Sequence, residues 1–114
     1  MKPRLALAAA LCLLATHPAL GQSKVYGNGA ASCGLFVAAA QASTAGNKTV
    51  DSYMMWLAGY ASMASAQTGV DYFNGTTTKA MQDWLEAYCL EHPQLAFDQA
   101  ALQLMVVLKG HQGS

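Results

Sequence analysis

The fold of this chain is decided by the stretch Met81-Gln82-Asp83-Trp84-Leu85-Glu86-Ala87-Tyr88-Cys89. Its large apolar residues recur at positions i, i+3, i+4, i+7 and i+8, which is the spacing of one face of an α-helix. The run Thr76-Thr77-Thr78 precedes this stretch and offers an N-cap, and His92-Pro93 follows it. We therefore predict a helix over about 79–91 that carries Cys89 on its core-facing side.

The same apolar spacing predicts three more helices around this one. Two lie upstream, over about 33–42 and about 50–67, and a fourth begins near Pro93. The expected starting residues are Ser32, then Thr49 or Asp51, then Pro93; Gly69 is expected to end the second helix and Gly110 the fourth. No strand alternation or repeat interrupts the pattern. The predicted fold class is therefore all-α, a small four-helix domain.

Each helix has a predicted core-facing side. In the first, second and fourth helices it holds Cys33, Phe36, Val37, Ala40, Tyr53, Trp56, Leu57, Tyr60, Ala64, Leu95, Phe97, Ala101, Leu104, Met105 and Leu108. Three methionines of the second helix, Met54, Met55 and Met63, are expected to fill gaps in the core. The pairs Trp56–Tyr60 and Trp84–Tyr88 recur one turn apart on two helices, so these rings either line a ligand pocket or belong to the core.

The cysteines indicate one disulfide. Cys12 lies in an N-terminal apolar run that we expect to be removed with a signal peptide. Two cysteines then remain, Cys33 and Cys89, and both lie on core-facing sides. An even number of cysteines in a small exported domain favours a bridge, and this one would link helix 1 to the end of helix 3. The alternatives are two free buried thiols or a metal site, although the sequence has neither a CxxC pair nor clustered histidines for zinc.

Residues 1–21 have the pattern of a secretory signal peptide. Lys2 and Arg4 precede the apolar run 5–15, and Ala19 and Gly21 place small residues at the expected cleavage site. The run is too short to cross a membrane core of ~30 Å as a helix, and the residues before Cys12 do not fit a lipid-anchor motif. We expect a single domain over 22–114 in the periplasm or outside the cell.

Composition limits the partners of this domain. The 114 residues allow one domain, and a net charge of zero provides no basic stripe for nucleic acid. Residues 22–114 contain four lysines and six carboxylates, which is few where about a quarter of residues are usually charged. We expect exposed apolar area around Gly59, Ser62 and Ala66 that binds another protein or a second copy, and no membrane contact after signal removal.

No residue pattern identifies a catalytic site. The run Tyr26-Gly27-Asn28-Gly29 resembles half of a glycine-rich phosphate loop but lacks the lysine and the preceding strand, so we interpret it as a turn. His92 is expected to cap a helix or to lie in solvent, Asp83 and Glu86 to lie on an exposed helical face, and Ser32 to have no histidine partner. The prediction is a protein that is not an enzyme and needs no cofactor or metal.

Three segments together resemble a family of small exported proteobacterial proteins without an assigned activity. They are Tyr26-Gly-Asn-Gly-Ala-Ala-Ser-Cys-Gly34, Trp56 with Gly59-Tyr60, and Trp84-Leu-Glu-Ala-Tyr-Cys89 with Pro93. At longer range, the two cysteines, the helix with Trp56 and Pro93 are similar to the HdeA/HdeB acid-stress chaperones, which implies protective protein binding in the periplasm. Gly59-Tyr60 and His92-Pro93 are similar to the Tai-type immunity proteins, which implies binding of a secreted toxin. Neither likeness implies catalysis.

Overall fold

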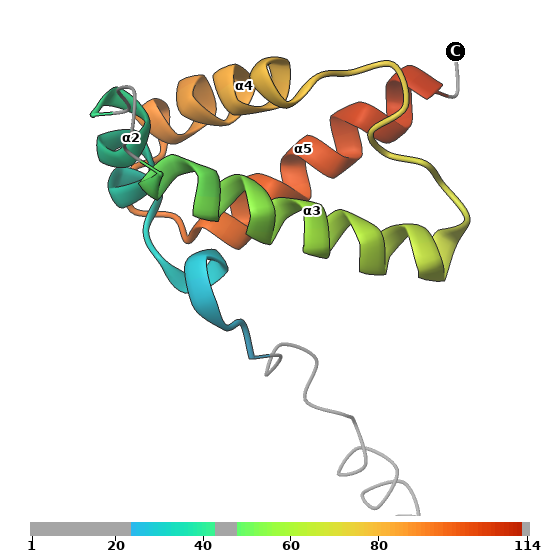
Figure 1. Ribbon diagram of the computed structural model, residues 1–114, viewed down its shortest axis with the longest axis horizontal. Helices are drawn as coiled ribbons and strands as arrows, with labels where there is room; N and C mark the ends of the chain where they lie inside the picture. Colours follow the sequence, from blue (N-terminus) through green and yellow to red (C-terminus); the bar gives the residue numbers. More distant parts are fainter. Residues whose placement is uncertain (1–23, 43–47, 113–114) are drawn as a thin grey trace, which may run out of the picture.

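The computed structural model describes residues 24–42 and 48–112 (Figure 1). They form a short 3-10 helix, η1 (Gly27–Ala30), and four α-helices, α2 (Cys33–Gln41), α3 (Thr49–Thr68), α4 (Thr78–Glu91) and α5 (Phe97–Gln112). The predicted all-α four-helix fold is confirmed. The run 26–29, expected as a turn, contributes most of η1. The predicted signal peptide, 1–21, lies outside the described residues.

The helices enclose one core. Figure 1 shows α2 across one end of the molecule, with α3 and α4 leading away from it and α5 running diagonally between them. Helix α2 packs on α3 and α4, α5 packs on α4, and η1 packs on both α3 and α5. The largest side chains that are fully buried in this core come from every α-helix: Phe36, Val50, Leu57, Leu85, Phe97 and Leu104.

The predicted disulfide is present between Cys33 and Cys89, whose Cα atoms are 4.9 Å apart. Both cysteines are completely buried. The bridge joins the first residue of α2 to the last turn of α4. The expected link between helix 1 and the end of helix 3 is therefore confirmed.

Local hydrogen bonds explain where three helices begin or end. The Ser32 hydroxyl accepts a hydrogen bond from the Leu35 amide at 3.2 Å, which confirms the predicted N-cap of α2. The Thr77 hydroxyl accepts one from the Ala80 amide at 3.1 Å, so the N-cap of α4 comes from the predicted run of threonines. Gly69 ends α3 in the left-handed conformation, with φ of 76°. The predicted cap of α3 is wrong: Lys48 occupies that position without a side-chain cap, and both Thr49 and Asp51 lie inside the helix.

Helix α5 begins at Phe97, four residues later than the predicted start at Pro93. The reason is tertiary hydrogen bonding. The amides of Cys33 and Gly34 donate to the carbonyls of Leu95 (2.7 Å) and Pro93 (3.0 Å), and the Phe97 amide donates to the Ala31 carbonyl (2.8 Å). Residues 93–96 therefore stay outside the helix and satisfy the free amides at the start of α2.

Helix α5 also ends later than predicted, because Gly110 lies inside it and the helix continues to Gln112. The Gln112 side-chain amide donates a hydrogen bond to the backbone carbonyl of Asp71 in the α3–α4 connection. This contact holds the last turn of α5 against that connection. A glycine can also lie inside a helix, at a cost of about 1 kcal/mol relative to alanine, so Gly110 alone does not end α5.

No helix in ranges 24–42 and 48–112 combines the length and the apolar character that crossing a membrane requires.

Candidate protein-binding face on α3

Helix α3 has a core-facing side and an opposite side that is exposed. Its buried residues are Val50, Tyr53, Met54, Leu57 and Ala61. At 100° per residue, the opposite side carries Met55, Gly59, Ser62, Met63 and Ala66, and all five are exposed. We call these five residues the outer face of α3. The predicted partner surface, Gly59, Ser62 and Ala66, lies on it, and its role in binding stays a prediction.

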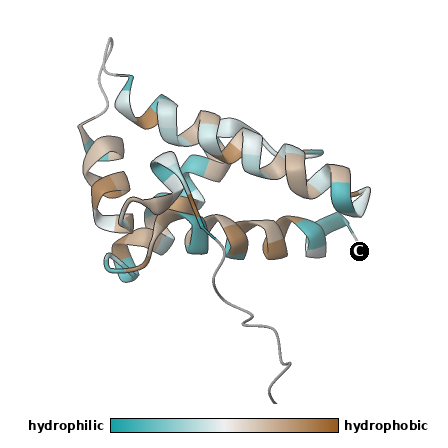
Figure 2. Cartoon of the chain, turned by 90° about the horizontal axis from the view of Figure 1, so that it is seen from below, coloured by the Kyte–Doolittle hydropathy of each residue, from teal (hydrophilic) through white to brown (hydrophobic). Residues whose placement is uncertain are grey.

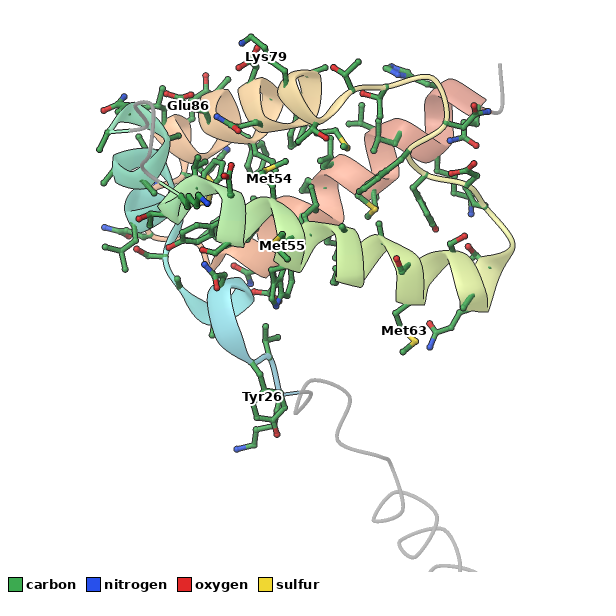
Figure 3. All side chains as sticks on the ribbon, viewed as in Figure 1. Tyr26, Met54, Met55, Met63, Lys79 and Glu86 are labelled. Atoms are coloured by element: carbon green, nitrogen blue, oxygen red, sulfur yellow. A yellow bond between two sulfur atoms is a disulfide. The ribbon has the colours of Figure 1, made fainter. Side chains whose placement is uncertain are left out.

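The outer face of α3 is apolar and uneven. The side chains of Met55 and Met63 are 74% and 62% exposed, and Met63 points away from the other helices (Figure 3). Between them, a Cβ atom built on Gly59 would meet nothing within 4 Å. The Ser62 hydroxyl donates to the Ala58 carbonyl of its own helix at 2.7 Å, so its donor is already used. The expectation that methionines fill core gaps holds for Met54 and is wrong for Met55 and Met63.

This face also lacks charge. The sequence has no Asp, Glu, Lys, Arg or His between Asp51 and Asp71. Figure 2 shows α3 in pale and brown colours along its middle, with teal at its ends. The solvent side of a surface helix normally carries charged residues. Here it combines exposed thioethers with small residues, and that composition is typical of a surface that contacts protein.

The segment containing η1 holds the N-terminal half of α3 in place through Trp56. The Trp56 indole N–H donates to the Tyr26 carbonyl at 2.9 Å. Asn28 adds a second link, because its side-chain amide donates to the Ser52 hydroxyl at 3.0 Å. Gly29 is buried directly against the indole ring. The Met55 end of the outer face is therefore anchored to the domain and pre-organised.

Gly29 is required because no side chain fits between η1 and Trp56. A Cβ atom at this position would lie 2.0 Å from Cζ2 of the Trp56 ring. We expect Gly29→Ala to lower the free energy of unfolding by about 1–3 kcal/mol, the usual cost of overpacking. Urea unfolding measures it. The matched control is Gly110→Ala, where the new Cβ meets nothing within 4 Å; equal stabilities of the two variants would contradict the contact.

A groove runs beside the outer face. It has a volume of about 470 Å³ and lies between α3 and the α3–α4 connection, lined by Ala58, Ala61, Ser62, Ser65, Ala66, Asp71, Tyr72 and Phe73. Tyr72 is buried and its hydroxyl lies 3.3 Å from the Thr68 hydroxyl, which fixes the connection against α3. Sequence reasoning missed this groove, because it depends on how residues 71–73 fold back onto the helix.

The four aromatic residues proposed for one ligand pocket do not meet. Trp56 stacks on Tyr60 with ring centres 5.2 Å apart, and Trp56 also contacts Phe97. Trp84 stacks on Tyr88 at 5.1 Å, and Tyr88 contacts His92. No ring contact joins the two pairs in the described part of the chain. Each pair packs, half-buried, against the core, as in the core interpretation.

Tyr60 has an unusual environment for a phenol. Burial raises its pKa above the ordinary value of 10.0, and the negative charges of Asp98 and of ionised Tyr72 raise it further. Burial also raises the pKa of Tyr53. A raised phenol pKa means that the folded protein favours the neutral form.

These two phenols predict a loss of stability in alkali. Their stabilising effect is complete below pH 10, the ordinary value, and is lost as the pH rises through the higher folded-state pKa. We expect the free energy of unfolding to fall as the pH rises above about 10, and to fall less in Tyr60→Phe and least in the double variant with Tyr53→Phe. Urea unfolding across this range measures the effect. An equally steep fall in the double variant would contradict it.

The other candidate residues lie apart from one another. Asp83 pairs with Lys79 at 2.9 Å on the exposed side of α4, and Glu86 is half-buried on the same helix. His92 is exposed at the C-cap of α4, as expected. Ser32 acts as an N-cap. Within the described residues, no group of three His, Cys, Asp or Glu is placed to hold a metal ion.

Comparison with known protein families, curated proteins and solved structures finds no match to this chain.

Proposed function

We propose that this protein is an exported, non-enzymatic domain that acts by binding protein through the outer face of α3. One observation carries the proposal: an anchored helix presents Met55 and Met63 to solvent on a face with no charged residue. Burying the exposed thioether side chains against a partner contributes a favourable free energy of about 25 cal/mol per Å² of apolar area removed from water. The Met55 end of the face needs no rearrangement to do so, because η1 and Trp56 already hold it.

The exposure of the acidic side chains favours binding by this preformed face over a mechanism that acid triggers. Acid unfolds a protein chiefly by protonating carboxylates that are buried or paired in the folded state. None of the described carboxylates is buried, and the ion pair between Lys79 and Asp83 is exposed. Exposed pairs of this kind contribute about 0.2–1 kcal/mol. We therefore propose binding at neutral pH, as the likeness to immunity proteins implies, rather than release of a hidden surface in acid.

Capture from exported-protein extract tests the proposal. Immobilised wild-type protein should retain a stoichiometric partner at about pH 7, either another protein or an untagged copy of this chain. Gly59→Arg should abolish that capture, because it places a charge in the centre of the face. Gly110→Arg, at the other helical glycine whose Cβ would meet nothing within 4 Å, is the matched control and should capture normally.

Two results would contradict this proposal. Capture that Gly59→Arg does not affect would place binding elsewhere on the molecule. Retention of many proteins in acid, at about pH 3, with none at neutral pH would favour the acid-chaperone function that the likeness to HdeA/HdeB implies.

A further inference from the structure

We infer that the partner of the outer face of α3 is a second copy of the same chain, packed with its own α3 antiparallel to the first. This inference rests on the proposed function and names the partner of that surface. It is carried by the spacing of large and small residues along the face, by the absence of charge on it, and by its anchoring at one end.

The spacing is self-complementary. A pairing of two antiparallel α3 helices centred at the level of Ala61 places Met63 of one copy opposite Gly59 of the other. The same register places Met55 within one residue of the level of Ala66. Each exposed methionine thus meets a small residue, and the two-fold axis repeats both contacts. The Gly59 position is open enough to receive a thioether, since nothing lies within 4 Å of a Cβ built there.

The charge distribution favours this occupant over a charged partner. Between Asp51 and Asp71 the chain offers no formal charge with which to attract or select a basic or acidic protein. Two copies of this face bring no like charges together along the middle of the helices; the same register places Asp51 of each copy at the level of Asp71 of the other, so the like charges lie at the two ends of the pair. The antiparallel arrangement places the negative end of each helix dipole beside the positive end of the other. A parallel pair would place the like ends of the two helix dipoles side by side. It would also place each methionine at the level of the same methionine in the other copy.

The size of the face sets the expected affinity. A helix of 20 residues is about 30 Å long, so a contact between two α3 helices belongs at the small end of specific interfaces, which bury roughly 1,200–2,000 Å². We therefore expect a reversible dimer that forms at high micromolar concentration.

Sedimentation velocity on the purified exported protein, from about 10 µM to about 1 mM, should show a monomer–dimer equilibrium. Gly59→Arg should raise the dissociation constant at least about tenfold, equivalent to about 1.4 kcal/mol. Gly110→Arg should leave the constant unchanged, and thermal unfolding should show that both variants are folded. A wild-type protein that stays monomeric throughout, or a Gly59→Arg variant that dimerises normally, would overturn the inference.

Cysteine cross-linking tests the direction of the pair. Ser62→Cys lies close to the proposed centre, so mild oxidation should join two copies through this residue. Ser52 is exposed on the same helix. In an antiparallel pair it lies far from Ser52 of the other copy, so the Ser52→Cys variant should not cross-link. Cross-linking at Ser52 would show a parallel pair and overturn the proposed register.

The outcomes also separate this inference from the proposed function. If the protein is monomeric but captures a different protein, and Gly59→Arg abolishes that capture, the surface binds protein and only the second copy is wrong. If neither a dimer nor a captured partner is found, both proposals fail.

Discussion

Cys89→Ser should lower the free energy of unfolding by about 2–5 kcal/mol, which is the usual cost of losing a native disulfide in a small domain. The Cys33–Cys89 bridge spans a sequence separation of 56, so it restricts much of the unfolded chain. In the folded variant, the new hydroxyl and the freed Cys33 thiol would stand in a site with no solvent exposure, and a hydroxyl without a partner there adds a desolvation cost. Denaturant unfolding under non-oxidising conditions measures the difference.

The reduced wild-type protein is the control for this experiment. Because reduction breaks the same bridge without changing a side chain, it should lose most of the same stability. The double variant Cys33→Ser/Cys89→Ser should be no more stable than Cys89→Ser. The backbone hydrogen bonds from Cys33 to Leu95 and from Gly34 to Pro93 do not involve the sulfur atoms, so we expect α2 to stay docked at low temperature in all these forms. A loss below about 1 kcal/mol would contradict the assigned role of the bridge.

Phe97→Ala should cost about 3–5 kcal/mol, the range for removing a large aromatic residue from a core. The Phe97 ring is fully buried and its centre lies 4.8 Å from that of Phe36, 5.1 Å from Tyr53 and 5.8 Å from Trp56. It therefore connects α2, α3 and α5, and the rings around it cannot all move inward to close the cavity. Thermal or urea unfolding measures the loss.

Leu102→Ala on the same helix is the matched control, because Leu102 is 51% exposed. We expect a change within about 0.5 kcal/mol there. If both alanine variants lose similar stability, the cluster around Phe97 does not dominate the core. Since Trp56 touches Phe97 and also holds η1, Phe97→Ala should also change the tryptophan fluorescence of the folded state.

The helices could be predicted from sequence because their signals are local. The apolar spacing of 81–89 and the capping positions Ser32 and Thr77 act within a few residues of each other, and the structure has them as expected. Gly69 ends α3 for the same kind of reason, as it adopts the left-handed conformation without a Cβ clash. The disulfide could be predicted because two apolar faces each carried one cysteine.

The starting point of α5 could not be predicted, because it depends on hydrogen bonds to residues 31–34 about sixty positions earlier. Pro93 would fit the first turn of a helix, but here its carbonyl accepts a hydrogen bond from the Gly34 amide instead. At the other end, α5 continues past Gly110 to Gln112, whose side chain contacts the Asp71 carbonyl. The environment of Trp56 is another such case: its position suggested core or ligand pocket, and only the fold places the Tyr26 carbonyl and Gly29 against it.

The sequence by itself determined that the chain forms four amphipathic helices joined by one bridge, because periodicity, caps and cysteine count act along the chain. It also predicted a partner surface at the row of small residues Gly59, Ser62 and Ala66, from the low charge of the domain. The tertiary structure decided that this row lies opposite the core, together with two methionines expected inside it. The physical reason is that only one side of a helix can face the core, and the packing of the neighbouring helices decides which side that is. Here η1, α2 and Phe97 bury the Tyr53–Leu57 side, and Met55 and Met63 are left in solvent.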